Sequence, residues 1–163
     1  FVAATNINDV VPEYLRTGKF YARPSTTTIS NAMDVGNPSN FWRMTELYND
    51  SLEAMTKDIT GFCITEEATR SAMKDCMSRY HYLLDPHGAV GYQAWIEFSQ
   101  NHEGANGIIL ETAHPSKFGS VVRETLGVEV DFPERLAEIV RKEKVSFLIS
   151  PDLEALKSYL LSR

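Results

Sequence analysis

Short apolar runs alternate along this chain with longer segments in which apolar residues recur every three or four positions. The apolar runs predict three short strands, because each is brief and is bounded by polar residues or glycine; they cover residues 1–5, 59–64 and 108–110. The longer segments predict helices that begin near residues 9, 38, 65, 86, 115, 133 and 151. We therefore expect a single α/β unit over residues 1–163, with a few-stranded sheet flanked by many helices and a helical tail over residues 128–163.

Two of the predicted helices carry clear start signals. Thr65 is followed by two glutamates, which favours a capped first turn near the positive end of a helix. Asp85 precedes Pro86, a pair typical of the N-cap and first helical position. Gly88 and Gly91 lie on this second helix and indicate close packing against a neighbouring element such as the sheet.

Composition and charge narrow the classes of function. The chain is 43% hydrophobic and 23% charged, as expected of a globular unit, and its net charge of −6 without a basic run argues against a nucleic-acid partner. Two cysteines and four scattered histidines give no zinc spacing, so we expect no metal site. No apolar stretch approaches the roughly 20 residues of a membrane span and no signal peptide is visible, so we expect no membrane association and a cytoplasmic protein.

The chain opens on Phe1, inside a predicted strand, rather than on methionine. A natural start within a strand is unusual. We therefore expect this sequence to be a piece of a longer polypeptide.

The richest chemical signal lies at residues 107–118, which read GIILETAHPSKF. A predicted strand ends there in a polar cluster, and Pro115 then opens a predicted helix. In open α/β sheets, ligands bind beyond the carboxyl ends of the strands. The hydroxyl group of Thr112, which can donate and accept a hydrogen bond, is thus expected where a cofactor ring could rest.

Four segments in this order resemble threonine synthase, a pyridoxal-phosphate enzyme of the tryptophan-synthase-β-like fold (fold type II). They are FVAATNINDVVPEYL, TTTISNAMDVGNPSNFWR, DPHGAVGY and TAHPSKF, and together they span about the first three quarters of the chain. The resemblance implies a C-terminal fragment of such an enzyme. The whole enzyme would convert O-phospho-L-homoserine and water to L-threonine and phosphate by γ-elimination and β-addition.

The resemblance also assigns a role to Thr112. In the family, a threonine at this place faces the ring nitrogen of pyridoxal 5'-phosphate. A hydroxyl there can donate to an unprotonated nitrogen and gives a milder electron sink than a carboxylate would. The alternative is an ordinary loop threonine that bonds nearby backbone.

Two anchors of the cofactor are missing from this sequence. In the family the Schiff-base lysine and the glycine-rich phosphate loop both precede the segment that starts at Phe1, and no GxGxxG-like run occurs here. We therefore expect no catalytic residue in this chain, weak cofactor binding and no turnover by the chain alone. Apolar surface left by the missing part is expected to drive self-association.

Six further residues are candidates for the substrate pocket: Ser30, Asn31, Asp34, His87, His114 and Lys117. The first three could line the pocket or only make local turn bonds. His87 could face a substrate or serve in packing and capping. His114 could bind the substrate phosphate or cap the next helix, and Lys117 could offer its charge to that phosphate or remain a surface lysine. Three polar residues after the first strand, Asn6, Asn8 and Asp9, could face a ligand or cap the helix that follows.

Other functions stay open at this stage. A different fold-type-II lyase, such as a threonine dehydratase, would use the same scaffold. A stand-alone α/β module could hold a phosphorylated metabolite at the start of the helix near residues 114–117. A purely structural or interaction domain would use its polar clusters only as caps and turns.

Overall fold

A computed structural model describes residues 1–162 of the chain. Its elements follow one another as β1 (Val2–Thr5), α1 (Val10–Thr17), α2 (Phe41–Leu47), α3 (Leu52–Asp58), β2 (Thr60–Cys63), α4 (Glu66–Tyr80), α5 (Pro86–Ser99), η1 (Pro115–Phe118), α6 (Gly119–Leu126), α7 (Glu134–Val140) and α8 (Leu153–Leu161). The α/β class predicted from the pattern is confirmed. Helix α3 was not predicted, although Ser51 caps it through its side chain.

The chain divides into two compact units, residues 1–131 and the part from Phe132 onward. The first unit contains the sheet and the helices up to α6. The second contains α7 and α8, neither of which has a buried residue.

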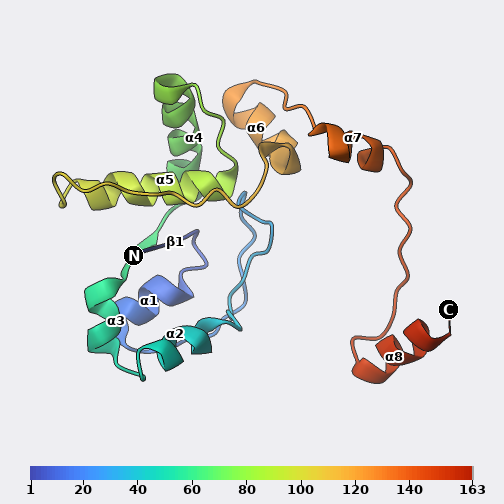
Figure 1. Ribbon diagram of the computed structural model, residues 1–163, viewed down its shortest axis with the longest axis horizontal. Helices are drawn as coiled ribbons and strands as arrows, with labels where there is room; N and C mark the ends of the chain where they lie inside the picture. The colour runs from blue at the N-terminus through green and yellow to red at the C-terminus, as the bar shows by residue number, and fades with distance from the viewer. Residues whose placement is uncertain (163) are drawn as a thin grey trace. The chain divides into compact units, whose positions relative to one another are not determined.

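The sheet of the first unit has two parallel strands, β1 and β2, paired from Val2 opposite Thr60 to Thr5 opposite Cys63. Successive residues of β1 face opposite sides of the sheet. Ala3 packs with the core of α1 and α3, whereas Ala4 packs with Val90 of α5. Figure 1 shows α1 and α5 on these two sides of β1.

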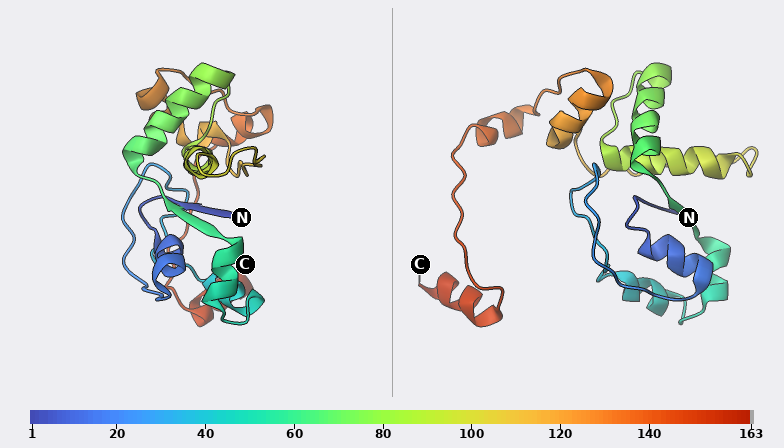
Figure 2. Two further views of the ribbon diagram at one scale, coloured as in Figure 1. Left: turned by 90° about the vertical axis from the view of Figure 1, so that its left-hand side faces the viewer. Right: turned by 180° about the vertical axis from the view of Figure 1, so that it is seen from behind.

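Helices α4 and α5 form the other half of the first unit, and the right-hand view of Figure 2 shows them crossing. Their shared core includes Met73 and Cys76 from α4 and Ala89 from α5, and Val122 of α6 closes it. Thr65 caps α4 and Asp85 caps α5 through their side chains, as predicted. The cap of Asp85 fixes the start of α5, where the candidate site lies.

The third predicted strand is wrong. Residues 108–110 are extended, but within residues 1–162 they pair with no strand. Only Ile109 is partly buried, while Ile108 and Leu110 are 92% and 77% exposed. An apolar extended run becomes a strand only when a neighbour satisfies its backbone groups, and β1 is paired on one edge alone.

Candidate functional site

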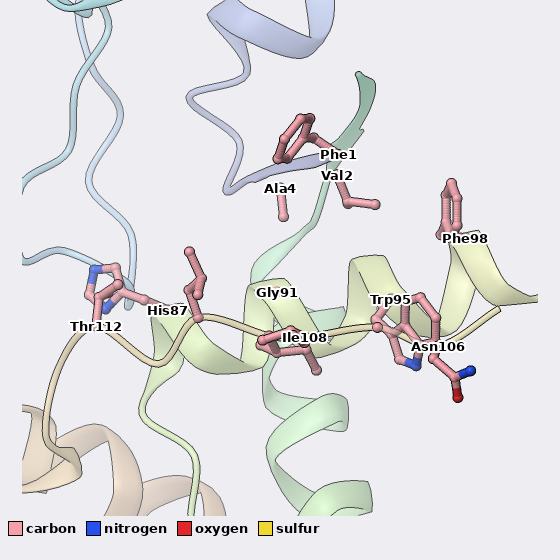
Figure 3. Close-up of a pocket in the computed structure, with 13 residues that line it drawn as sticks. Phe1, Val2, Ala4, His87, Gly91, Trp95, Phe98, Asn106, Ile108 and Thr112 are labelled. Atoms are coloured by element: carbon pink, nitrogen blue, oxygen red, sulfur yellow. The ribbon is translucent and has the colours of Figure 1, made fainter. Parts of the chain in front are cut away.

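An open cavity of about 520 Å³ lies between β1 and the extended segment 106–112, with α5 beside it. In Figure 3 the labelled residues Phe1 to Ala4 and Asn106 to Thr112 run in the same direction, toward His87. Most of the lining is apolar or aromatic, whereas Thr112 and His87 bring polar groups to the end of the cavity where both segments finish. This is the edge at which α/β sheets bind ligands.

Thr112 is exposed and lines this cavity. Among residues 1–162, nothing forms a hydrogen bond with its side chain. The side chains of Glu111, His87 and His114, in contrast, have such partners. The hydroxyl group of Thr112 is therefore free to donate to, or accept from, a bound molecule.

His87 lies in the first turn of α5 and lines a second cavity of about 260 Å³ as well as the first. Its Nδ1 lies 2.7 Å from the carboxylate of Asp85, and its Nε2 accepts from the backbone N–H of Ala32 at 3.3 Å. Because Nε2 accepts, Nδ1 carries the proton that is donated to Asp85. The ring also packs against Phe118, with centroids 4.9 Å apart. The imidazole is thus held on both nitrogens between the two cavities.

Ser30 and Asp34 belong to a polar cluster at the carboxyl end of β1. The side-chain amide of Asn6 donates to Thr28, Ser30 and Asp34 at distances of 2.9 to 3.2 Å. Asp34 also accepts from the hydroxyl and the backbone N–H of Thr28. Ser30 is buried and lines the second cavity, while Asn31 is exposed. The sequence did not indicate this cluster, because its members are far apart in the chain, with 28 positions between Asn6 and Asp34.

Asn8 lines the second cavity, as does Asn6, whereas Asp9, His114 and Lys117 line neither cavity. His114 caps η1, since its Nδ1 accepts from the backbone N–H of Ser116 at 3.2 Å and lies 2.8 Å from that residue's hydroxyl. The structure thus contains the capping contact considered for His114. Lys117 is exposed in η1. Asp9 makes no capping bond to α1 and instead forms an ion pair with Arg23.

Two carboxyl groups that the sequence did not single out for chemistry meet beside His87. Asp85 is fully buried and accepts the backbone N–H of His87 at 2.8 Å. Burial alone would raise the pKa of Asp85, but hydrogen bonds from His87 and Glu111 lower this pKa to about 2. Burial of its carboxyl group, together with the hydrogen bond to Asp85 and the repulsion of that charge, raises the pKa of Glu111 to about 8. These opposite shifts favour an ionised Asp85 beside a protonated Glu111 near neutral pH.

Residues 88–160 match the family described as threonine synthase, C-terminal. The threonine synthase of Escherichia coli is 35% identical over 162 residues, and that of Haemophilus influenzae is 37% identical over 161 residues; each match covers 99% of this chain. The predicted resemblance to the threonine synthases is thus confirmed. The chain spans about 37% of the length of these curated relatives.

Solved structures agree with this similarity. A crystal structure of the Escherichia coli threonine synthase superposes with a TM-score of 0.85 and 34% identity, covering 99% of this chain and 37% of the other. A structure of pyridoxal-phosphate-bound threonine synthase from Brucella melitensis gives a TM-score of 0.76 at 25% identity, covering 98% of this chain and 39% of the other. The predicted fold of these enzymes is therefore confirmed for this chain.

The described residues fit one edge of the cofactor found in the Brucella protein. An unpartnered hydroxyl at the mouth of a cavity with aromatic walls suits a ring nitrogen. No lysine of residues 1–162 lines this cavity, and no three histidine, cysteine or acidic side chains among them gather as a metal site would require. None of the helices in that range is long and apolar enough to cross a membrane.

Proposed function

We propose that this chain is the C-terminal part of a threonine synthase that converts O-phospho-L-homoserine and water to L-threonine and phosphate with pyridoxal 5'-phosphate. The observation that carries the proposal is the free hydroxyl of Thr112 at the mouth of the larger cavity. Similarity to threonine synthases over 99% of the chain supports it.

Bound pyridoxal phosphate would act as an electron sink for the substrate carbons. Thr112 would hold the ring by donating its hydroxyl proton to the ring nitrogen. A neutral hydroxyl leaves this nitrogen unprotonated, so the sink is weaker than one with a carboxylate partner. His87 would flank the same ring edge, because it lines the cavity at the end where Thr112 lies.

The covalent and phosphate anchors of the cofactor would come from outside residues 1–162. The chain alone is therefore expected to bind pyridoxal phosphate weakly and to catalyse no turnover. Titration of the isolated chain should give no stoichiometric absorption band that borohydride abolishes. A stable, stoichiometric adduct would contradict this part of the proposal.

The polar candidates around the smaller cavity would hold the loop that borders the substrate side of the pocket. Ser30 and His87 both line the smaller cavity. We propose that these two residues form its wall on the substrate side, and that Asn31 and Asp34 shape the same loop. His114 and Lys117 would contribute to phosphate binding near η1, where the ammonium group of Lys117 supplies the positive charge.

The exposed apolar rim of the larger cavity would be covered by the rest of the polypeptide. Phe1, Ile108 and Leu110 are 91%, 92% and 77% exposed, and extended backbone lies on both sides of the cavity. The isolated chain is expected to self-associate through this face. Light scattering at increasing concentration should show oligomers, which a charged residue introduced by Leu110→Lys should reduce.

The activity is tested on the full-length natural polypeptide. We expect phosphate release from O-phospho-L-homoserine, and no comparable reaction with phosphoserine or threonine as controls. Turnover of threonine in place of phosphohomoserine would indicate a dehydratase instead. Tight binding of a phosphorylated metabolite by the isolated chain, without any turnover by the full-length protein, would indicate a binding module.

A further inference from the structure

The segment 107–111 lies on α5 through every second residue. A Cβ atom on Gly107 would meet the ring of Trp95 at 2.5 Å, so the backbone lies directly on the indole. Farther along, a Cβ on Gly91 would contact Ile109 at 3.2 Å. Figure 3 shows this segment passing along α5 toward His87. The register of the segment on the helix is therefore set by these contacts.

Glu111 makes the last of these contacts, and it is a polar one. A Cβ atom on Gly88 would lie 2.2 Å from Oε2 of Glu111, so the carboxyl group occupies space that only glycine leaves open. Oε1 accepts from the backbone N–H of Asp85 at 3.4 Å. The side chain of Glu111 thus reaches the start of α5, although the residue as a whole is exposed.

Asp85 connects this contact to His87. Its buried carboxylate accepts the backbone N–H groups of His87 and Gly88 at 2.8 and 3.4 Å. The same oxygen that accepts from the backbone of His87 lies 2.7 Å from Nδ1 of its ring. The carboxylate of Asp85 therefore holds the helix start and the imidazole ring, and the backbone N–H of the same residue contacts Glu111 at the end of the extended segment.

We propose that Glu111 and Asp85 are positioning residues: the protonated carboxyl of Glu111 donates to Asp85 and so fixes Thr112 and the ring of His87 at the cavity. This inference rests on the proposed function of Thr112. Because Thr112 directly follows Glu111, a shift of that carboxyl group moves the hydroxyl as well. Neither carboxyl group needs to touch the cofactor or the substrate.

The positioning would depend on the charge of Glu111. The titratable groups around it are Asp85 at the start of α5, His87, whose ring contacts Asp85, and Cys76 on α4, whose thiol pKa is raised by burial and by the charges of Asp75 and Glu111. None of these brings a positive charge that would offset an ionised Glu111 beside Asp85. Ionisation of Glu111 would therefore place two negative charges together and release the segment.

The experiment compares Glu111→Gln, Glu111→Ala and the control Glu103→Gln in the full-length protein. The affinity for pyridoxal phosphate is measured by fluorescence from pH 6 to 9.5. The unchanged protein should lose affinity as the pH rises through the raised pKa of Glu111, about 8. Glu111→Gln should not show this loss, because the amide of glutamine can still donate to Asp85 but cannot ionise. Glu111→Ala should bind roughly tenfold more weakly at pH 7.

The control Glu103→Gln should match the unchanged protein, because Glu103 lies in an exposed loop. The same alkaline loss in Glu111→Gln as in the unchanged protein, or unaltered affinity in Glu111→Ala, would overturn the inference.

A readout without cofactor separates this inference from the proposed function. In the cofactor-free protein, the carboxyl carbon of Glu111 should titrate near pH 8 in a ¹³C NMR experiment, and this transition should be missing from Glu111→Gln. Titration near the ordinary value of 4.5 would overturn the carboxyl pair even if the enzyme is a threonine synthase. If Glu111 titrates near pH 8 but the unchanged protein fails to bind the cofactor, the proposed function would instead be wrong.

Discussion

The polar groups at the ends of β1 and of the segment 106–112 differ in how completely they are bonded. After β1, the side chains of Asn6, Thr28 and Ser30 bond one another and Asp34. At the end of the other segment, Thr112 has a hydroxyl without a partner among residues 1–162. A polar cluster that satisfies itself holds a loop in place, whereas a polar group left open beside a cavity is available to a ligand.

The largest effect is expected on activity, when the open hydroxyl group of Thr112 is removed. Thr112→Ala in the full-length protein should lower kcat by roughly 100-fold, because the ring nitrogen loses its donor in an apolar site, and Thr112→Ser should restore most of it. Stability should change little, since the hydroxyl has no partner to lose. Steady-state kinetics with thermal unfolding checks both, and unchanged activity in Thr112→Ala would contradict the role given to this residue.

A substitution in the polar cluster of Asn6, Thr28, Ser30 and Asp34 should instead lower the stability of the protein. Asp34→Ala removes the acceptor of Thr28 and of Asn6, and we expect it to lower the free energy of unfolding by about 2–3 kcal/mol. Asp34→Asn should cost less, because its carbonyl oxygen still accepts. Urea unfolding of the full-length protein measures both. A loss of stability below 0.5 kcal/mol, roughly the scatter of surface substitutions, would speak against a structural role.

The contact between Glu111 and α5 is tested by adding a Cβ atom at position 88, where the carboxyl group of Glu111 lies. Gly88→Ala would place a Cβ atom 2.2 Å from Oε2 of Glu111 and should cost about 1–3 kcal/mol of stability, since the extended segment must move. Gly119→Ala is the matched control: a Cβ there meets nothing within 4 Å, at a helical φ of −54°. That change should be neutral or stabilising by up to about 1 kcal/mol. Equal effects of the two substitutions would exclude the close approach of Glu111.

The smallest expected effect is the pH dependence of stability. Because the pKa of Glu111 is raised from 4.5 to about 8, its contribution is fully present below pH 4.5 and is lost as the pH rises through 8. Asp85 behaves oppositely, contributing above pH 3.8 and losing its contribution as the pH falls through about 2. Solvent screening of the exposed Glu111 should limit its share to roughly 1 kcal/mol. In urea titrations, the free energy of unfolding of Glu111→Gln should decline less steeply between pH 5 and 9 than that of the unchanged protein. An equally steep decline would show that other groups cause the pH dependence.

Local signals predicted most of the helices and both paired strands. The caps at Thr65 and Asp85 act within a few residues, so the sequence alone could predict them. The segment 108–110 was wrongly assigned to a strand because pairing depends on a neighbour, which apolar character does not guarantee.

The site itself was predictable only in part. Thr112 could be placed at the end of an extended segment from its position in the sequence. The contact of Glu111 with Asp85 joins residues 26 apart, and only the glycine at position 88 hinted at it. The cluster around Asn6 depends on how a loop folds back, which no periodicity encodes.

The central claim is a hydrogen bond between Thr112 and the cofactor ring, and ¹⁵N NMR of the full-length protein loaded with ring-labelled pyridoxal phosphate tests it directly. We predict the chemical shift of an unprotonated, hydrogen-bonded ring nitrogen, which moves toward that of a free pyridine nitrogen in Thr112→Ala. A shift typical of a protonated ring, or one that Thr112→Ala leaves unchanged, would contradict the account.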